Sequence, residues 1–328
     1  MQVILVILLF ILGLLFIIKG GDYLVDASLL LSKVTNISKI VIGATLMSLG
    51  TALPEISVSL IAILNNLHSM AVGNAVGSMI CNIALVIGIS IIIAPQKIKI
   101  IGFKNKAYIL LILNILLFLF CLNLDVGYIE SIILLICCVI FFFVNFLEVK
   151  KTFKKQSSMQ KLVIGTPSKN SNIKNYIFLA LKFVTGCAGV MVGANLIVHN
   201  GEILALMLGV STQIVGFTII ALGTSLPELI TTLTAVKKNS LELALGNVIG
   251  ANIINITLLF GLGGLMAGIG GLRIPKNISL GSIPILIMIT LIFILPILKR
   301  HKTYKLQGVI LLTIYIIYTL YILSTHIW

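Results

Sequence analysis

Charged residues are scarce in this 328-residue sequence: Asp, Glu, Lys and Arg together make up only 10% of the chain. Soluble domains carry about 25% charged residues, whereas here 59% of the residues are hydrophobic and the mean hydropathy is +1.20. Apolar stretches of roughly 20 residues, long enough to cross a bilayer as helices, recur along the whole chain. This composition excludes a soluble domain and predicts an all-α polytopic membrane protein.

The sequence also lacks the patterns of a disulfide framework or a zinc site. Its cysteines are odd in number and lie within apolar stretches without a CxxC or Cys/His pattern. They are Cys81, Cys121, Cys137, Cys138 and Cys187. No HExxH or DxD motif is present, and His68, His199, His301 and His326 are all expected outside the buried part of the molecule. We therefore expect no cofactor.

Hydropathy and helix-breaking residues divide the chain into ten predicted spans. They lie near residues 2–32, 39–64, 69–93, 105–122, 127–147, 176–204, 211–236, 241–268, 278–298 and 306–325. The first and sixth are longer than a bilayer requires, so we expect them to be tilted or bent. The first span has no basic segment before it and no small-residue cleavage site after it, which favours a retained helix over a signal peptide.

Acidic residues are the rarest charged type, with nine against 23 Lys and Arg, and the formal net charge is +14. If the N-terminus is outside, 19 of the 23 basic residues fall in loops that face the cytoplasm, and only Arg273 and Lys276 fall in outside loops. This positive-inside bias predicts a multi-pass protein of the plasma membrane with both termini outside. It also explains the net charge without nucleic-acid binding.

Two motifs each occur twice in the chain, and the offset between the two copies is the same for both motifs. GATLMSLGTALPE (43–55) matches GFTIIALGTSLPE (216–228) at eight of thirteen positions, and GNAVGSMICN (73–82) matches GNVIGANIIN (246–255) at five of ten. Each half of the chain contains five predicted spans, an odd number, so the halves insert in opposite orientations. Inverted repeats are typical of secondary transporters, whose substrate site lies near the midplane between the halves.

We therefore divide the chain into two five-helix repeats, 1–147 and 176–328, which contain the motif regions 43–82 and 216–255. A basic linker, 148–175, joins them on the cytoplasmic side. It is too short and too rich in lysine to form a regulatory domain, and we expect it to lie against anionic headgroups of the bilayer.

Only two of the nine acids, Glu55 and Glu228, fall well inside hydrophobic helices, and they occupy equivalent positions in the two repeats. A charge near the bilayer centre costs roughly 2.5–3.5 kcal/mol even on the most lenient scale. No basic residue is predicted at comparable depth, so a bound cation is the natural partner. The alternative is a pair of protonated glutamates that hydrogen-bond between helices.

The residues around each glutamate supply further oxygen ligands. Pro54 has no N–H, so the carbonyl of Gly50 loses its helical partner, and Pro227 has the same effect in the second repeat. Thr51 and Thr224 lie four residues before the glutamates and project from the same helix face. Each repeat thus offers a carbonyl, a hydroxyl and a carboxylate, which is the all-oxygen set that hard cations prefer.

The second motif carries glycines and asparagines at helical spacing. Its GxxxG pattern in each repeat predicts close packing of helices. Asn82 and Asn255 are favoured as cation ligands, whereas Asn74 and Asn247 are favoured as links between helices.

At these motifs the sequence resembles the sodium/calcium exchanger family of the cation/calcium antiporter superfamily, in its prokaryotic form. The resemblance implies inverted five-helix repeats, alternating access by sliding of the first and sixth helices, and exchange of Na⁺ for Ca²⁺. We also expect the protein to function as a monomer. Carried over by position, it implies a cation-binding set that includes two backbone carbonyls, those of Ser48 and Ala221. The set is Glu55, Glu228, Thr51, Thr224, Ser48, Ala221, Ser78, Ser225, Asn82 and Asn255.

Two departures from the family pattern leave the counter-ion open. Exchangers of the archaeal type carry an aspartate where Asn255 stands, and Ala251 replaces a usual serine. Two carboxylates balance one Ca²⁺ or two Na⁺. Exchange of Ca²⁺ for H⁺ or another cation therefore stays an alternative, because a buried glutamate can bind a proton in place of a metal ion.

Two other classes of function also stay open. A passive cation channel would use the same ligands, and it would conduct without a counter-ion gradient. An intramembrane metal-dependent hydrolase is a remote alternative, because acid and base roles need unlike environments and the two glutamates stand in equivalent motifs.

Overall fold

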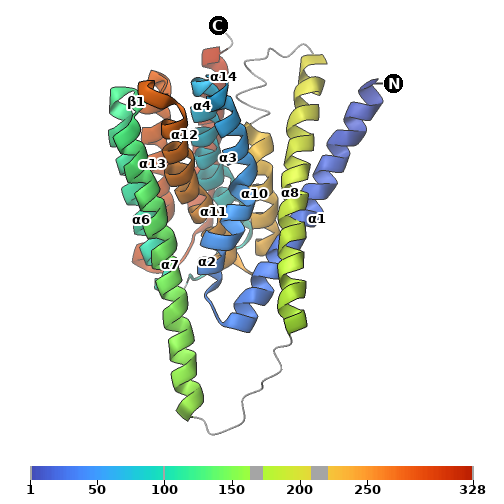
Figure 1. Ribbon diagram of the computed structural model, residues 1–328, viewed down its shortest axis with the longest axis vertical. Coiled ribbons are helices and arrows are strands. Elements are labelled where there is room, and N and C mark those ends of the chain that lie inside the picture. The colour runs from blue at the N-terminus through green and yellow to red at the C-terminus, as the bar shows by residue number, and fades with distance from the viewer. Residues whose placement is uncertain (1, 99, 163–172, 208–220, 327–328) are drawn as a thin grey trace.

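The computed structural model describes residues 2–98, 100–162, 173–207 and 221–326, and these residues are mostly helical (Figure 1). Nine segments of this described part are long and apolar enough to span a membrane, and they correspond to nine of the ten predicted spans. The predicted span near 211–236 lies partly outside the described residues, and helix α10 (Ala221–Lys237) covers the rest of it. The predicted all-α polytopic fold is confirmed.

The first half contains five spans, and two of them include a π-helical segment. The elements are α1 (Gln2–Thr35), α2 (Lys39–Ile42) with η1 (Gly43–Met47) and α3 (Ser48–Leu64), α4 (His68–Ile80) with η2 (Cys81–Ile87) and α5 (Gly88–Ile93), α6 (Ile100–Phe120) with the short 3-10 turn η3 (Cys121–Asn123), and α7 (Tyr128–Leu162). Segments η1 and η2 are π-helices that continue into α-helix on both sides.

The second half is described from α8 onward. After α8 (Ile173–Met207) and α10 come α11 (Leu241–Ile254) with η5 (Asn255–Leu259) and α12 (Phe260–Met266), then η6 (Gly268–Gly270), η7 (Ile278–Ser282) with α13 (Ile283–Arg300), and α14 (Lys305–His326). Segments η5 and η7 are π-helices, and η6 is a 3-10 turn.

Asparagine marks the ends of three helices. Asn36, Asn66 and Asn239 follow α1, α3 and α10, and each has a positive φ between 53° and 60°. Asparagine tolerates this left-handed conformation better than most residues. Asn66 and Asn239 are also separated by the offset of the repeated motifs, so the equivalent helices of the two halves end with the same residue type.

Part of the predicted linker 148–175 is helical. Helix α7 continues to Leu162 and α8 begins at Ile173. The extension 148–162 contains five Lys and two Gln, which are good helix formers, so the helix continues past the apolar span. Residues 163–172 of the predicted linker lie outside the described part.

Helices α1 and α8 run side by side along one flank of the molecule (Figure 1). Glycines on both helices allow the close approach. A Cβ atom added to Gly13 would lie 2.9 Å from the Gly193 carbonyl oxygen, and one added to Gly20 would lie 2.8 Å from the Gly186 carbonyl oxygen. Side chains at these positions would separate the helices, so small residues determine this interface.

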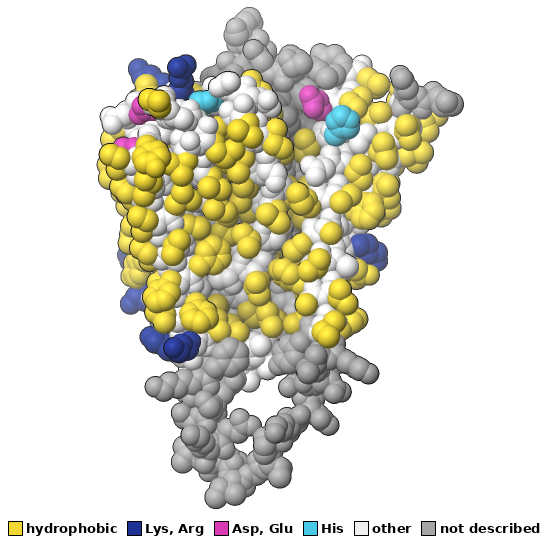
Figure 2. All heavy atoms as spheres, in the orientation of Figure 1, with side chains coloured by type: hydrophobic (Ala, Val, Ile, Leu, Met, Phe, Trp, Pro, Cys, Tyr) yellow, Lys and Arg dark blue, Asp and Glu magenta, His cyan; other side chains and the backbone are white. Residues whose placement is uncertain are grey.

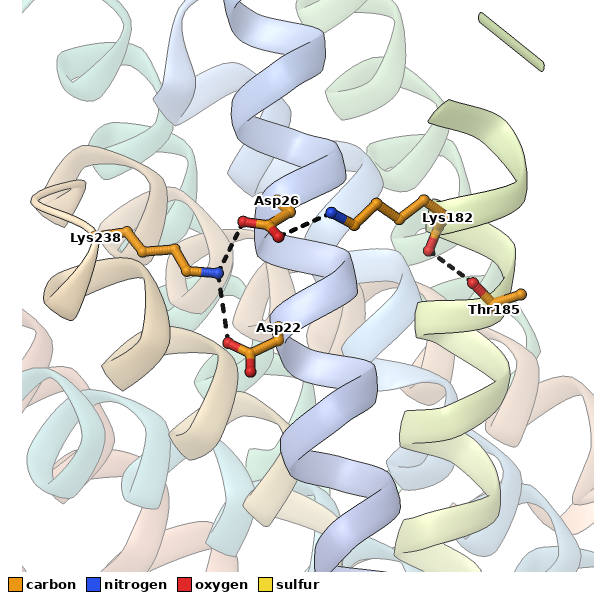
Figure 3. A network of polar contacts seen from close by, with 5 residues as sticks. All are labelled: Asp22, Asp26, Lys182, Thr185 and Lys238. Carbon is orange, nitrogen blue, oxygen red and sulfur yellow. Dashed lines mark hydrogen bonds and ion pairs between the residues drawn. The ribbon is translucent and has the colours of Figure 1, made fainter. Parts of the chain in front are cut away.

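An ion-pair network ties this pair of helices to α10 (Figure 3). Lys182 of α8 donates to Asp26 Oδ2 of α1 at 2.8 Å. Lys238, directly after α10, donates to Asp26 Oδ1 at 2.8 Å and lies 3.4 Å from Asp22 Oδ1. Asp26 therefore pairs with lysines from two other spans.

The spans that carry the repeated motifs form the core. In the most apolar 18-residue stretch of each span, 61% of the residues are buried in Lys39–Leu64, 72% in His68–Ile93 and 83% in Leu241–Met266. The corresponding share is 22% in α1 and in α8. Gly246 of α11 packs directly on the backbone of Ile40, and Gly250 packs on Ala44. The close packing predicted for this GxxxG pair is confirmed.

Hydrophobic side chains cover most of the visible face, and Lys and Arg side chains lie mainly near its upper and lower margins (Figure 2). Short backbone pairings join loops at the two ends of the helix bundle. Strands β1 (Asp125–Val126) and β2 (Leu272–Arg273) pair antiparallel at one end, and a bridge pairs Lys97 with Lys302 at the other.

Candidate cation site

Glu55 and Glu228 are both completely buried, with 0% of each side chain exposed. Glu55 belongs to α3 and Glu228 to α10, and these two helices pack against each other. Ser225, three residues before Glu228 on α10, donates to Glu55 Oε1 at 2.8 Å. The structure therefore brings together two acids that belong to opposite halves of the sequence.

The carboxylate of Glu55 is held by two donors from the second half of the chain. Ser225 Oγ donates to Glu55 Oε1 at 2.8 Å, and Asn255 Nδ2 donates to Glu55 Oε2 at 2.7 Å. Hydrogen bonds to an ionised acceptor are among the stronger ones in proteins. Of the predicted ligands, Ser225 and Asn255 thus lie directly beside Glu55.

Neither oxygen of Glu228 accepts a hydrogen bond from the described residues, although Glu228 occupies the equivalent position in the other repeat. The sequence explains the difference. Ala52 stands where Ser225 stands in the second repeat, so there is no hydroxyl to donate. The equivalent of Asn255 is Asn82, whose amide donates to Asn252 Oδ1 at 3.3 Å instead.

Sequence reasoning missed Asn252. Its Oδ1 accepts from Asn82, and its Nδ2 donates to the carbonyl of Met79 at 3.1 Å. Met79 is also the residue that occupies the equivalent position in the first repeat. The available signal was an additional amide within the second motif, GNVIGANIIN, that has no polar counterpart in the first.

Several other buried oxygens of the predicted set lack a hydrogen-bond partner among the described residues. They are Ser78 Oγ, Asn82 Oδ1 and Asn255 Oδ1, in addition to the two oxygens of Glu228. Buried polar groups are almost always satisfied in proteins, so these five oxygens are the members of the predicted set that are left to accept a contact from a ligand.

The two threonines link the halves in a reciprocal way. Thr51 Oγ1 donates to Asn247 Oδ1 at 3.3 Å, and its counterpart Thr224 Oγ1 donates to Asn74 Oδ1 at 3.0 Å. Both asparagines therefore bind between helices, the role favoured for them from the sequence. A hydroxyl keeps acceptor lone pairs after it donates, so these bonds leave both threonine oxygens chemically able to ligate a cation.

The two predicted carbonyl ligands are those of Ser48 and Ala221. Ser48 is fully buried, and its carbonyl lies 3.4 Å from Thr51 Oγ1. Ala221 is the first residue of α10, next to residues 208–220 outside the described part. The ligand role of Ala221 stays a prediction.

Both favoured asparagine ligands lie in π-helical segments. Asn82 is the second residue of η2, and Asn255 is the first residue of η5. A π-helical turn widens the helix, frees its regular hydrogen bonding and is frequent at functional sites. The sequence motifs gave no indication of these segments.

Comparison with known proteins identifies the family. A family model described as sodium/calcium exchanger protein matches residues 5–147 and 178–324. The chain belongs to this family. The resemblance noted in the sequence motifs is therefore confirmed.

Relatives of the sodium/calcium exchanger family match over nearly the full length. The sodium/calcium exchanger MaX1 of Methanosarcina acetivorans is 31% identical, covering 94% of this chain and 96% of its own. A membrane protein of Methanocaldococcus jannaschii is 35% identical, covering 94% and 95%. A solved structure of the sodium-calcium exchanger NCX_Mj, soaked with 10 mM Na⁺ and zero Ca²⁺, superposes with a TM-score of 0.81 at 33% identity, covering 96% of this chain and 98% of that one.

As a member of the sodium/calcium exchanger family, this chain is a multi-pass membrane protein that acts as a cation/calcium antiporter, and it is not an enzyme. The intramembrane hydrolase considered from the sequence is thereby set aside.

Proposed function

We propose that this protein exchanges Na⁺ for Ca²⁺ by alternating access at a site built on Glu55 and Glu228. The observation that carries the proposal is the asymmetric pair of buried acids, in which Glu228 has two unpartnered oxygens. The names of MaX1 and NCX_Mj support the choice of ions. The repeated motifs support two inverted repeats, and the lysine distribution supports a plasma-membrane orientation with both termini outside.

Glu228 is the primary cation ligand in this scheme. Its free oxygens, together with Ser78 Oγ, Asn82 Oδ1 and Asn255 Oδ1, supply five oxygen ligands, and Ca²⁺ takes about 6–8. Glu55 is held in place by Ser225 and Asn255, and it supplies the second negative charge. Threonine hydroxyls and the carbonyls of Ser48 and Ala221 complete the set.

Charge balance explains why the two ions compete. Two ionised carboxylates are neutralised by one Ca²⁺ or by two Na⁺, and an unbalanced charge in a low-dielectric interior is costly. A carrier whose loaded forms alone are neutral moves across the membrane only when occupied, so Ca²⁺ leaves as Na⁺ enters.

The α1–α8 pair is the moving element in this proposal. Glycines line the interface between α1 and α8, which leaves few side chains to oppose sliding. The two helices are much less buried than the motif-bearing core. The network around Asp26 connects the pair to α10, the helix that carries Glu228. The whole site lies within one chain, which supports function as a monomer.

Uptake of ⁴⁵Ca²⁺ into proteoliposomes tests the proposal. Uptake should require an outward Na⁺ gradient and should be abolished by Glu55→Gln and by Glu228→Gln. Glu130→Gln is the matched control, because Glu130 lies in the first turn of α7, away from the site. Normal exchange in either site variant would remove the two acids from the mechanism, and Ca²⁺ flux without any counter-ion gradient would identify a channel.

Exchange of Ca²⁺ for H⁺ is the second candidate, because asparagine stands at both 82 and 255 and the site has only two acids. The same vesicles distinguish the two. Uptake that follows a pH gradient and ignores the Na⁺ gradient would replace Na⁺ with H⁺ as the counter-ion.

A further inference from the structure

A groove with a volume of about 830 Å³ lies between α13 and α14, and no residue of the candidate cation site lines it. Its walls include Met288, Leu291, Leu295 and Arg300 from α13, and Leu306 and Ile310 from α14. The volume is within the range of small-molecule sites, about 300–1,000 Å³. Leu295, Leu306 and Ile310 are exposed, so the groove is open to the hydrocarbon that surrounds the protein.

The groove matches the length of one lipid leaflet. From Met288 to Arg300 the helix rises by about 18 Å, at about 1.5 Å per residue, and half of a hydrocarbon core of about 30 Å is about 15 Å. The lining is apolar from Met288 to Pro296, and its polar members, Arg300, Tyr304 and Gln307, gather at one end.

Of these polar residues, Gln307 is already engaged. Pro296 has no N–H for the carbonyl of Ile292, and Gln307 Nε2 donates to that carbonyl at 3.1 Å and to the carbonyl of Phe293 at 2.7 Å. Its Oε1 lies 3.3 Å from the Tyr304 amide nitrogen, as the acceptor. The polar groups left for a ligand at this end are therefore the Arg300 guanidinium, which is the only cation of the lining, and the Tyr304 hydroxyl.

Arg300 stands in a concentration of positive charge that we name the basic corner: Lys97, Lys299, Arg300 and Lys302. Two loops form it, joined by hydrogen bonds from Ile98 N to His301 O at 2.8 Å and from Thr303 N to Gln96 O at 3.1 Å. Neither 94–98 nor 299–305 contains an acid. Among the described residues, Arg300 makes no ion pair.

We propose that this groove binds one anionic phospholipid, with an acyl chain along α13 and α14 and the phosphate at Arg300. An apolar groove of leaflet length that ends in uncompensated positive charge matches the acyl chain and the phosphate of such a lipid, and it does not match a simple ion. A helix from a second copy would fill the apolar part but leave the basic corner without a counter-charge. Under the proposed orientation the corner faces the cytoplasm, where anionic lipids attract juxtamembrane lysine and arginine.

Native mass spectrometry of the full chain in detergent tests the proposal. Dioleoylphosphatidylglycerol and dioleoylphosphatidylcholine are added in equal amounts, and the adducts that survive activation are counted. We expect one phosphatidylglycerol to be retained in preference to phosphatidylcholine. Arg300→Gln should weaken that adduct about five-fold, the effect of about one interfacial charge. Lys299→Gln, which removes a neighbouring charge outside the groove lining, should change it less.

A second variant tests the apolar part separately. Leu295→Trp fills the groove and should reduce retention of phosphatidylglycerol, whereas Leu320→Trp, at an exposed position of α14 outside the groove, should not. Equal retention of the two lipids, an unchanged adduct in Arg300→Gln, or equal losses in Arg300→Gln and Lys299→Gln would each overturn the proposal. None of these outcomes depends on ion exchange. If Leu295→Trp fails to fold, Arg300→Gln and Lys299→Gln still test the proposal.

Discussion

Asn255 Nδ2 donates to Glu55 Oε2 at 2.7 Å, which places an amide of the second repeat directly on the acid of the first. Replacing Asn255 with aspartate removes the donor and sets a carboxylate against Glu55. The added charge requires a further cation, so Asn255→Asp should steepen the dependence of Ca²⁺ exchange on Na⁺ concentration. The Hill coefficient for Na⁺ in proteoliposomes measures this. Asn255→Ser, which removes the amide without adding charge, is the control, and an unchanged coefficient in Asn255→Asp would show that the missing acid does not limit sodium coupling.

The unequal surroundings of the two glutamates predict opposite effects on stability. Glu228 is buried without a hydrogen bond from the described residues, so Glu228→Gln should raise the Tm of the cation-free protein and abolish its stabilisation by Ca²⁺. Glu55→Gln places an amide against the donors Ser225 and Asn255, so it should lower the Tm. An unsatisfied buried group costs about 1–3 kcal/mol. Thermal unfolding in detergent with EDTA and then with Ca²⁺ provides the measurement, and equal shifts in both variants would contradict the asymmetry.

The cause of that asymmetry can be tested by restoring the missing donor. Ala52 is completely buried and occupies the position equivalent to Ser225. In Ala52→Ser, the new hydroxyl should donate to Glu228 as Ser225 donates to Glu55, and a Glu228 held in this way should bind Ca²⁺ more weakly. We expect a higher Ca²⁺ concentration for half-maximal exchange. Ala62→Ser, at a buried position of the same helix beyond the motif, controls for the added hydroxyl, and a similar change in that variant would assign the effect to packing.

Much of the fold and of the site could be predicted from the sequence, because hydropathy and a repeated motif report on burial directly. The offset shared by the two motifs marked Glu55 and Glu228 as a pair, and the structure places both in the core. The reciprocal bonds of Thr51 and Thr224 follow the same symmetry.

What could not be predicted is local backbone geometry and tertiary contact. The π-helical segments that contain Asn82 and Asn255 have no residue pattern that marks them, and such segments are rare in proteins. The partnership of Asn82 with Asn252 depends on tertiary contact between α11 and η2. The helical extension of α7 was missed because lysine-rich sequence was assigned to a loop, although lysine favours helix.

The network at Asp26 predicts a change in transport rate without a change in ion affinity. Asp26→Asn removes the charge that holds Lys182 and Lys238, and so loosens the link between the α1–α8 pair and α10. Partly exposed ion pairs contribute about 0–1 kcal/mol, so the maximal exchange rate should rise by no more than about five-fold. Initial rates against Ca²⁺ concentration check this, with Lys33→Gln as a control on the same helix. A shift in the half-saturating Ca²⁺ concentration would instead connect Asp26 to the binding site.

Close packing of the core predicts a selective cost for one methyl group. A Cβ atom at Gly246 would meet the backbone of Ile40, which cannot move aside as a flexible side chain can, whereas a Cβ atom at Gly281 would meet nothing within 4 Å. Overpacking of this kind typically costs about 1–3 kcal/mol. Gly246→Ala should therefore lower the Tm in detergent and the yield of folded protein, while Gly281→Ala should leave both unchanged. Because α11 presents Asn247 to Thr51 one residue after Gly246, any Gly246→Ala protein that does fold should also exchange Ca²⁺ more slowly, and full activity at normal stability would show that the two halves do not need this contact.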